Sequence, residues 1–474
     1  MNFYFYDLET SGFSPRSARI MQFAGQRTDM NLEPVGEPDN ILVKVTPDIL
    51  PEPGAVLVHG ITPQQTLADG ITEAELTKYL TAQVFLPDTI AVGFNNIRFD
   101  DEFIRFTFWR NFIDAYEWAW KDGRSRWDLL DVVRMTRALR PEGIEWPFAP
   151  DGKPSNRLEF LSAVNELNHA NAHDALSDVR ASIALARLVK QKQPKLFDYL
   201  LRLRDKKPVA ALVTASQPFI YTSGRYPAEF EKTTVAVMLA PHPERGAALV
   251  YDLRIDPTKF TKLTAAQLAK LWNDRDREAP YFPVKLLAYN KSPAIAPLSV
   301  LDAKSAVRLK IDSAVIDKNL AKLRKAEDFG DKLIAALEVM QPKAQTKMIA
   351  NPQEVDSQLY DGFVNDNDKT KMSVVRAATA NELSNLNLDF ADDRLKFLLP
   401  LYKARNFPKS LSPEEQAKWQ DFCRQRLTSG GDSSPAARFS KRLEELEKQT
   451  GLSAQERYLL EELNLYGQSL AAVD

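Results

Sequence analysis

The stretch that decides the fold is MNFYFYDLETSGFSPRS, residues 1–17, in which a short aromatic run ends in two carboxylates, Asp7 and Glu9. Side chains of a strand alternate between its two faces, so Asp7 and Glu9 point the same way, about 7 Å apart along the chain, with Leu8 on the opposite face. Two like charges side by side repel each other. The pattern therefore predicts either a cation held between them or an exposed strand end without a role.

The composition is that of a globular protein. With 474 residues, 44% of them hydrophobic, the chain is long enough for two to four domains. A net charge of -2 gives no overall attraction to a polyanion, so nucleic-acid binding would need a local basic surface or metal ions. A single cysteine, Cys423, excludes an internal disulfide framework and a cysteine-built zinc site. Without a cationic leader or a run of about 18 apolar residues, we expect a soluble, cytoplasmic protein.

The texture of the sequence changes twice along the chain. Residues 1–193 alternate strand-like and helix-like segments, which predicts an α/β domain with a mixed central sheet. Thr72 and Glu75 predict a capping box for a helix over 72–84. Further helices are expected after Phe99, after Asp128, after Asn156 and over 174–191. Strands are expected at 3–7, 19–29, 40–45 and 89–95.

The second and third regions are expected to differ in class. Residues 194–350 contain β-rich pieces separated by Pro and Gly and interrupted by one helix at 264–274, which favours a small barrel or sandwich. From 351 to 474 the strand patterns stop, and segments with helical periodicity follow one another with short polar joints. We therefore expect an all-helical C-terminal domain.

Two further segments provide groups that match the first pair of acids. FNNIRFDDEF, residues 94–103, places Asp100 at a helix start, and HDALSD, residues 173–178, places His173 and Asp178 at another. Because such strand ends and helix starts converge at one edge of an α/β sheet, we expect the four acids and His173 to gather there. Oxygen ligands favour Mg²⁺ or Mn²⁺ over zinc, and two ions about 4 Å apart would support phosphodiester hydrolysis. His173 would supply the base for the attacking water.

These motifs carry a resemblance to a known family. D-x-E-T at 7–10, N-x-x-F-D at 96–100 and H-x4-D at 173–178, in this order, resemble the DEDDh family of 3'-to-5' exonucleases, which share a ribonuclease H-like fold. Longer stretches over nearly the whole chain resemble bacterial exonuclease I: NNIRFDDEF, SRWDLLDVVR, ALRPEGIEWP, NAHDALSDV, QPKLFDYL, VDSQLYDGF and KARNFP.

The resemblance implies an architecture and an activity. It implies a ribonuclease H-like nuclease domain at 1–193, an SH3-like β-rich domain at 194–350 and a helical domain at 351–474. It further implies that these three domains close around a strand of DNA. The implied activity is processive, Mg²⁺-dependent hydrolysis of single-stranded DNA from its 3' end to 5'-mononucleotides, in DNA repair and recombination.

The resemblance also assigns roles to residues. Asp7, Glu9 and Asp178 would hold one Mg²⁺, Asp7 with Asp100 would hold the second, Mn²⁺ would be the substitute ion, and His173 would be the general base. Arg157 would bind the 3'-terminal nucleotide, and Glu9 would also bind the substrate. The strand would be contacted further by Arg105, Tyr116, Trp120 and Arg134.

The aromatic and basic residues between 98 and 140 themselves indicate a strand-binding surface, because bases stack on aromatic rings and arginines pair with phosphates. A monomer is expected. The family further implies binding of the acidic, hydrophobic C-terminal tail of the bacterial single-stranded DNA-binding protein, for which Arg140 is a candidate rim residue. Two alternatives remain: a 3'-to-5' exoribonuclease or proofreading exonuclease with the same acids, and a nucleic-acid-binding adaptor with an inactive nuclease fold.

Overall fold

The computed structural model describes residues 1–167, 174–243, 246–274, 281–340 and 350–471. The chain divides into two compact units, of which the first comprises 1–124, 170–180 and 348–474, and the second comprises 125–169 and 181–347. Within the described residues, no helix combines the length and the apolar character needed to cross a bilayer.

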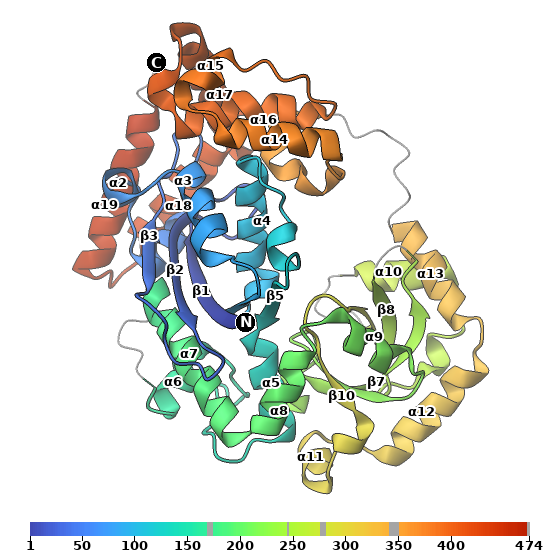
Figure 1. The fold of residues 1–474 in the computed structure, drawn as a ribbon. Helices are drawn as coiled ribbons and strands as arrows, with labels where there is room; N and C mark the ends of the chain where they lie inside the picture. Colours follow the sequence, from blue (N-terminus) through green and yellow to red (C-terminus); the bar gives the residue numbers. More distant parts are fainter. Residues whose placement is uncertain (168–173, 244–245, 275–280, 341–349, 472–474) are drawn as a thin grey trace. The chain divides into compact units, whose positions relative to one another are not determined.

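The sheet of the first unit is built around a strand whose two faces are both covered. β1 (Asn2–Thr10) pairs antiparallel with β2 (Ile20–Thr28) and parallel with β4 (Thr89–Gly93), and β3 (Asp39–Leu42) pairs antiparallel with β2. The run from Phe3 to Tyr6 is buried, as expected for a central strand. This mixed sheet confirms the predicted α/β class (Figure 1).

The helices at 73–79, 100–110 and 175–192 lie where the sequence predicts helices, whereas those at 53–59 and 63–69 were not predicted. The Thr72 and Glu75 capping box is present at the start of α3, which ends at Tyr79 and continues as a π-helical turn, Leu80–Val84. α7 begins in the first unit and runs on into the second. The bounds are α1 (Pro53–His59), α2 (Pro63–Asp69), α3 (Glu73–Tyr79), α4 (Asp100–Arg110) and α7 (Ala175–Lys192).

The C-terminal region of the first unit is helical, as predicted. Its core is shared with helices of the N-terminal part of the unit. Trp109 of α4 belongs to one apolar cluster with Leu359 and Met372, and Val56 of α1 belongs to another with Phe439. After a 3₁₀ segment (Val355–Asp361) come α14 (Asp366–Ala377), α15 (Ala380–Asn385), α16 (Asp393–Asn406), α17 (Pro413–Thr428), α18 (Pro435–Glu447) and α19 (Ala454–Ala471).

The second unit contains a five-stranded antiparallel sheet in the order β10-β6-β7-β8-β9. Its strands are β6 (Phe219–Thr222), β7 (Thr233–Pro241), β8 (Ala247–Asp252), β9 (Val284–Ala288) and β10 (Ala294–Pro297). The stretch 284–297 thus forms two strands that lie at opposite edges of the sheet, because β10 pairs with β6 and β9 with β8.

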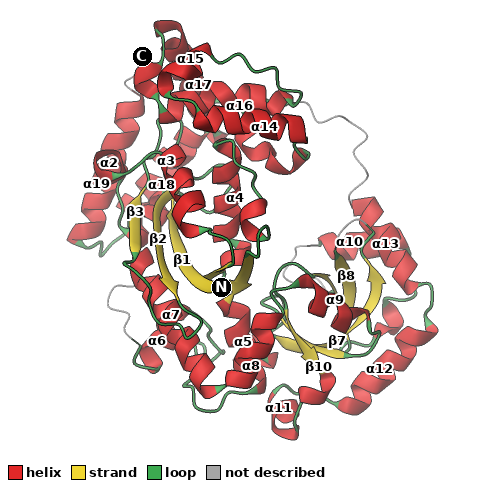
Figure 2. Ribbon diagram, viewed as in Figure 1, coloured by secondary structure: helices red, strands yellow, loops and turns green. Residues whose placement is uncertain are grey.

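The sequence predicted one helix in this β-rich region, but the described part of it contains more. Besides α10 (Ala265–Asn273), helices accompany the sheet on both sides of it in sequence (Figure 2). They are α8 (Pro194–Arg202), α9 (Lys206–Thr214), α11 (Ala303–Arg308), α12 (Ser313–Lys325) and α13 (Phe329–Met340). The unit also contains β5 (Ser125–Asp128), α5 (Leu129–Leu139) and α6 (Leu158–Val164).

Candidate active site

Three of the four predicted acids come together in the first unit. Asp7 and Glu9 lie at the end of β1 on the same face, and Asp178 lies in the first turn of α7. One carboxylate oxygen from each of the three lies within 4.8 Å of the others. The fourth acid, Asp100, is the first residue of α4 and is 4% exposed. The alternation of β1 and the start of α7 therefore bring three of the four expected acids together.

The crowding of these acids changes their protonation. Burial, followed by the negative charges of Asp100, Asp178 and Asp174, raises the pKa of Asp7 well above its ordinary value. Burial, followed by Asp7, Asp178 and Asp174, raises the pKa of Glu9 to about 9. Without a cation, the group therefore holds protons that ordinary carboxyls would release. A divalent ion reverses this balance, because it stabilises the carboxylates in their charged form.

Hydrogen bonds distinguish the adjacent acids Asp100 and Asp101, of which only one was predicted to be a metal ligand. Asp101 is fully buried and accepts hydrogen bonds from the Tyr6 hydroxyl and, at 3.2 Å, from Asn96 Nδ2. Asn96, the first residue of the N-x-x-F-D motif, therefore holds Asp101 within the core. Asp100 is the acid whose charge acts on Asp7.

The donor set fits a hard divalent cation. Within the part of the chain described, Asp7, Glu9 and Asp178 offer carboxylate oxygens, with no histidine or cysteine in their group. Oxygen-only sets are typical of Mg²⁺ and Mn²⁺ sites, in which water completes the coordination. Asp174 adds negative charge nearby but accepts the Ser177 backbone N–H at 3.1 Å, so it caps α7.

His173, the predicted general base, lies outside the described residues. Its role stays a prediction from the H-x4-D motif. The neighbouring Asp174 was not among the predicted site residues, although it raises the pKa of both Asp7 and Glu9. Its position in HDALSD, at the start of a predicted helix, was the available signal.

Three of the predicted strand-binding residues lie in the first unit. Arg105 of α4 pairs with Glu102 at 2.8 Å, and its guanidinium lies 5.6 Å from the ring centre of Tyr116. Trp120 is 64% exposed, so its ring is not a core residue. Arg105 on α4 and the aromatic side chains of the segment that follows α4 thus occur close together, an arrangement suited to a single strand.

The other predicted contact residues belong to the second unit. Arg134 of α5 pairs with Asp131 at 2.7 Å, and Arg157 is 71% exposed beside Glu159 at 3.5 Å. Arg140, the candidate rim residue for the partner tail, donates to the Val300 carbonyl at 2.9 Å. Their relation to the acidic cluster stays a prediction.

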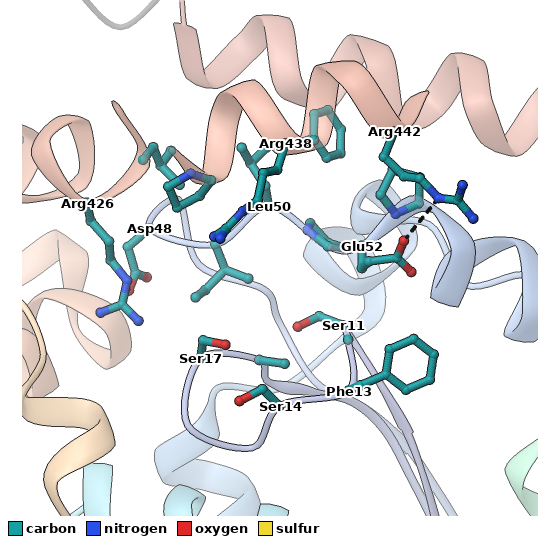
Figure 3. A pocket seen from close by; sticks show the side chains of 18 residues that line it. Ser11, Phe13, Ser14, Ser17, Asp48, Leu50, Glu52, Arg426, Arg438 and Arg442 are labelled. Atoms are coloured by element: carbon teal, nitrogen blue, oxygen red, sulfur yellow. Dashed lines mark ion pairs between the residues drawn. The ribbon is translucent and has the colours of Figure 1, made fainter. Parts of the chain in front are cut away.

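A cavity of about 450 Å³ lies beside the loop that follows β1 (Figure 3). Helix α18 supplies Arg438 and Arg442 to its wall, and Arg442 pairs with Glu52 at 3.6 Å. Arg426 of α17 lies 3.7 Å from Asp48 in the same wall. The C-terminal helices thus form charged pairs with the segment at 48–52, which lines this cavity together with the loop that follows β1.

Comparison with known proteins places the whole chain in one family. Three family models match consecutive parts of it: an exonuclease domain at 4–186, the exonuclease I SH3-like domain at 204–339 and the exonuclease I C-terminal domain at 353–470. Exodeoxyribonuclease I of Haemophilus influenzae is 40% identical over 474 residues, which cover 98% of each chain.

Solved structures agree with the sequence comparison. Exonuclease I from the moderately thermophilic Methylocaldum szegediense matches with a TM-score of 0.93 and 40% identity, over 99% of this chain and all of the other. Escherichia coli exonuclease I in complex with a dA16 oligonucleotide matches with a TM-score of 0.91 and 38% identity, over 99% of each chain. From its sequence, its three consecutive domain matches and its fold, the chain belongs to the exonuclease I family of exodeoxyribonucleases.

Proposed function

We propose that the chain is a Mg²⁺-dependent 3'-to-5' exonuclease that degrades single-stranded DNA processively to 5'-mononucleotides, as a cytoplasmic monomer in DNA repair and recombination. The observation that carries this proposal is the meeting of Asp7, Glu9 and Asp178 within 4.8 Å. The relatives solved with DNA oligonucleotides support single-stranded DNA as the substrate. The E. coli enzyme has also been solved with single-stranded DNA in a zinc-bound form, which supports a divalent-metal site.

The acids are assigned to two ions. Asp7, Glu9 and Asp178 would hold one ion, and Asp7 with Asp100 would hold the second. When bound, such ions stabilise the charge that develops on the phosphate oxygens and lower the pKa of a coordinated water. The carboxylate-only donor set favours Mg²⁺, with Mn²⁺ as its substitute.

His173 is assigned as the general base that takes the proton of the attacking water. Its ordinary pKa of about 6.5 suits this task near neutral pH. Substitution of His173 by alanine leaves the four acids in place, so DNA binding should persist while the single-turnover rate falls by roughly 10² to 10⁴. A variant that binds DNA weakly yet cleaves bound DNA at the wild-type rate would make His173 a positioning residue.

Arg157 is assigned to the 3'-terminal nucleotide, and Glu9 is assigned to substrate binding as well as to the metal. The DNA strand beyond the terminal nucleotide is assigned to Arg105, Tyr116, Trp120 and Arg134. A solved structure of SSB and exonuclease I in complex with an inhibitor supports the single-stranded DNA-binding protein as a partner. Its acidic tail would bind at a basic surface that includes Arg140.

The substrate assay uses 3'-labelled and 5'-labelled single-stranded DNA, duplex DNA and RNA, each with Mg²⁺ or EDTA. We expect mononucleotide release from the 3' end of single-stranded DNA that EDTA abolishes. Equal release from RNA would favour the exoribonuclease alternative, and no release from any substrate would favour the inactive adaptor.

Variants of the acids test the metal assignment separately. Asp7→Ala or Asp178→Ala should lower cleavage by at least about 10³-fold with folding intact, because the metal supplies several kcal/mol to the transition state. Asp174→Asn is the matched control, because it removes a nearby negative charge while an acceptor remains for the Ser177 N–H. Its activity should stay within about tenfold of wild type. If Asp174→Asn lost as much activity as the alanine variants, the acids would act through their summed negative charge and not as individual metal ligands.

A further inference from the structure

Asp101 is an acid at a core position of α4. It is fully buried, and Ile104 and Phe108, three and seven residues later, belong to the same apolar cluster as Tyr6 and Leu8 of β1. Residues at these spacings share one face of a helix. Asp101 therefore lies on the face with which α4 packs on the sheet, where an apolar side chain would be the ordinary choice. A buried carboxylate at such a position needs hydrogen-bond donors around it.

The donors come from the central strand and from the turn before the helix. Oδ1 of Asp101 accepts hydrogen bonds from the Tyr6 hydroxyl and, at 3.2 Å, from Asn96 Nδ2. Tyr6 is 2% exposed and Asn96 is completely buried, so water does not compete for these bonds. The bond from Tyr6 ties the first turn of α4 to one position along β1.

The two consecutive acids of α4 act on opposite faces of the strand. Tyr6 and Asp7 are neighbours in β1, so their side chains point to opposite faces of the sheet. Asp101 is bonded to Tyr6, whereas the charge of Asp100 acts on Asp7. Consecutive side chains of a helix are about 100° apart around its axis, which lets one turn reach both groups. The anchoring of Asp101 thus determines where Asp100 lies relative to Asp7.

We propose that Asp101 is a positioning residue: its hydrogen bond from Tyr6 fixes α4 on β1 and thereby sets the separation of Asp100 from Asp7 that the second metal ion requires. This inference rests on the proposed function, in which Asp7 and Asp100 share that ion. Residues that orient metal ligands typically cost roughly 10- to 100-fold in metal affinity when they are lost. The other ion has no proposed ligand on α4, so its affinity should not change.

The same strand offers a matched control for the Tyr6 hydroxyl. Tyr4 lies two residues earlier on the same face, and its hydroxyl donates to the carboxylate of Asp39 on β3. Both tyrosines are 2% exposed, and their ring centres lie 6.3 Å (Tyr4) and 6.1 Å (Tyr6) from that of Phe23. Phenylalanine at either position removes a buried hydroxyl from a carboxylate, but only Tyr6 acts on the neighbour of a proposed metal ligand.

The two carboxylates are matched as well. Asp39 also accepts from the Tyr79 hydroxyl, just as Asp101 also accepts from Asn96. Each acid therefore keeps one donor when its β1 tyrosine is replaced. A difference in metal binding between the two variants cannot come from the mere loss of a buried hydrogen bond.

The test compares wild type, Tyr6→Phe and Tyr4→Phe in their binding of Mn²⁺, in the presence of a single-stranded oligonucleotide whose 3'-terminal phosphorothioate linkages resist cleavage. Electron paramagnetic resonance measures free Mn²⁺ as the total is raised. In Tyr6→Phe one of two ions should bind roughly 10- to 100-fold more weakly, and in Tyr4→Phe both should bind as in wild type. Melting temperatures in EDTA should fall by a similar few degrees in both variants, because each loses one buried hydrogen bond.

Kinetics provide a second readout. The Mg²⁺ concentration that gives half the maximal single-turnover rate should rise by the same factor in Tyr6→Phe and stay unchanged in Tyr4→Phe. Saturating Mg²⁺ should restore the rate of Tyr6→Phe, because no metal ligand has been removed. Binding of the oligonucleotide in EDTA should be the same for all three proteins, since both hydroxyls are buried.

A conservative variant separates the bond of Asp101 from its charge. Asp101→Asn keeps Oδ1, the oxygen that accepts from both Tyr6 and Asn96, so its Mn²⁺ affinity should stay close to that of wild type. Asp100→Asn removes a proposed ligand and should lose the second ion. If Asp101→Asn lost that ion as completely as Asp100→Asn, Asp101 would act through its charge and the positioning role would be overturned. If Tyr6→Phe did not fold, Asn96→Ala would take its place, because it removes the other donor to the same oxygen.

The outcomes separate this inference from the proposed function. If wild type binds fewer than two Mn²⁺ ions or does not degrade single-stranded DNA, the two-ion assignment fails and the inference fails with it. If wild type binds two ions but Tyr6→Phe binds both as tightly as Tyr4→Phe, only the positioning role is overturned. Selective weakening of one ion in Tyr6→Phe, with the rate restored by high Mg²⁺, supports it.

Discussion

The substitution Asp356→Asn tests how the C-terminal region is held on the nuclease region. Asp356 is 1% exposed and accepts from Arg19 at 2.7 Å, from Arg405 at 2.8 and 2.9 Å, and from Arg426 at 2.8 Å. Burial alone would raise its pKa, but the three guanidinium groups hold the pKa of Asp356 well below its ordinary value. Asparagine keeps the shape of the side chain and removes the charge.

The expected loss follows from the charges that remain. Asp48 would be left facing Arg19, Arg405 and Arg426, of which the first two are almost completely buried. Removing one partner from a buried ion pair costs about 3–5 kcal/mol, because the desolvated opposite charge is left without compensation. A domain is typically stable by about 5–15 kcal/mol, so this loss is a large part of the total.

Urea unfolding of both proteins, followed by circular dichroism, measures the loss, and hydrogen exchange over 355–361 shows whether that segment opens first. The control is Asp421→Asn on α17, where an exposed pair with Arg424 at 2.8 Å should contribute no more than about 1 kcal/mol. The reasoning is refuted if Asp356→Asn costs no more than Asp421→Asn.

The same variant makes a prediction about pH. A carboxyl whose pKa is depressed in the folded state stabilises the protein above its unfolded pKa of about 3.9, and that contribution disappears as the pH falls toward the folded value. The difference between wild type and Asp356→Asn should therefore be constant near neutral pH and shrink below about pH 4.

Three further predictions concern the site and its surface. Asp7→Asn should stabilise the metal-free protein by about 1–2 kcal/mol at pH 8 and progressively less toward pH 5. Folding raises the pKa of Asp7 and Glu9, that of Glu9 to about 9 against an ordinary 4.5, so the cost of keeping these groups protonated in the folded protein grows as the pH rises above their unfolded values. Thermal melts in EDTA measure this, and a lower melting temperature at pH 8 would contradict it. Arg105→Ala should reduce the slope of the logarithm of the DNA-binding constant against the logarithm of the salt concentration by about 0.7, whereas Trp120→Ala should weaken binding with that slope unchanged. Affinities and slopes equal to those of wild type would assign both residues to other roles. Arg140→Ala should weaken binding of a synthetic acidic tail peptide at low salt, where charge contacts are strongest, and wild type that binds no peptide would end the partner assignment.

The sequence was most informative where local rules decide the structure. The alternation of Asp7, Leu8 and Glu9 follows from strand geometry alone, and the Thr72 capping box needs only a hydroxyl and an acid three residues apart. The identity of Asp100 as the site acid could be carried over from a motif. Its physical reason, the capture of Asp101 by the Tyr6 hydroxyl, required the structure because the two are far apart in sequence.

Where partners are distant in sequence, pattern reasoning had no signal. Within the β-rich region, Ala288 ends one edge strand and Ala294 begins the other, a division that only sheet pairing determines. Helices α11 to α13 were missed because the region was assigned from the pattern of its strands.

The buried ion network gives the C-terminal region a role beyond covering apolar surface. Arg19 lies just before β2, and its backbone N–H donates to Ser11 Oγ at 2.8 Å while Ser11 N–H donates to the Arg19 carbonyl at 2.8 Å, which closes the loop that follows Glu9. The guanidinium of the same Arg19 is bound by Asp356 at 2.7 Å. A residue of the C-terminal region therefore helps to order the loop that follows Glu9. Because Asp356 belongs to the 3₁₀ segment Val355–Asp361, this segment links the C-terminal region to the loop beside the acids that we propose bind the metal.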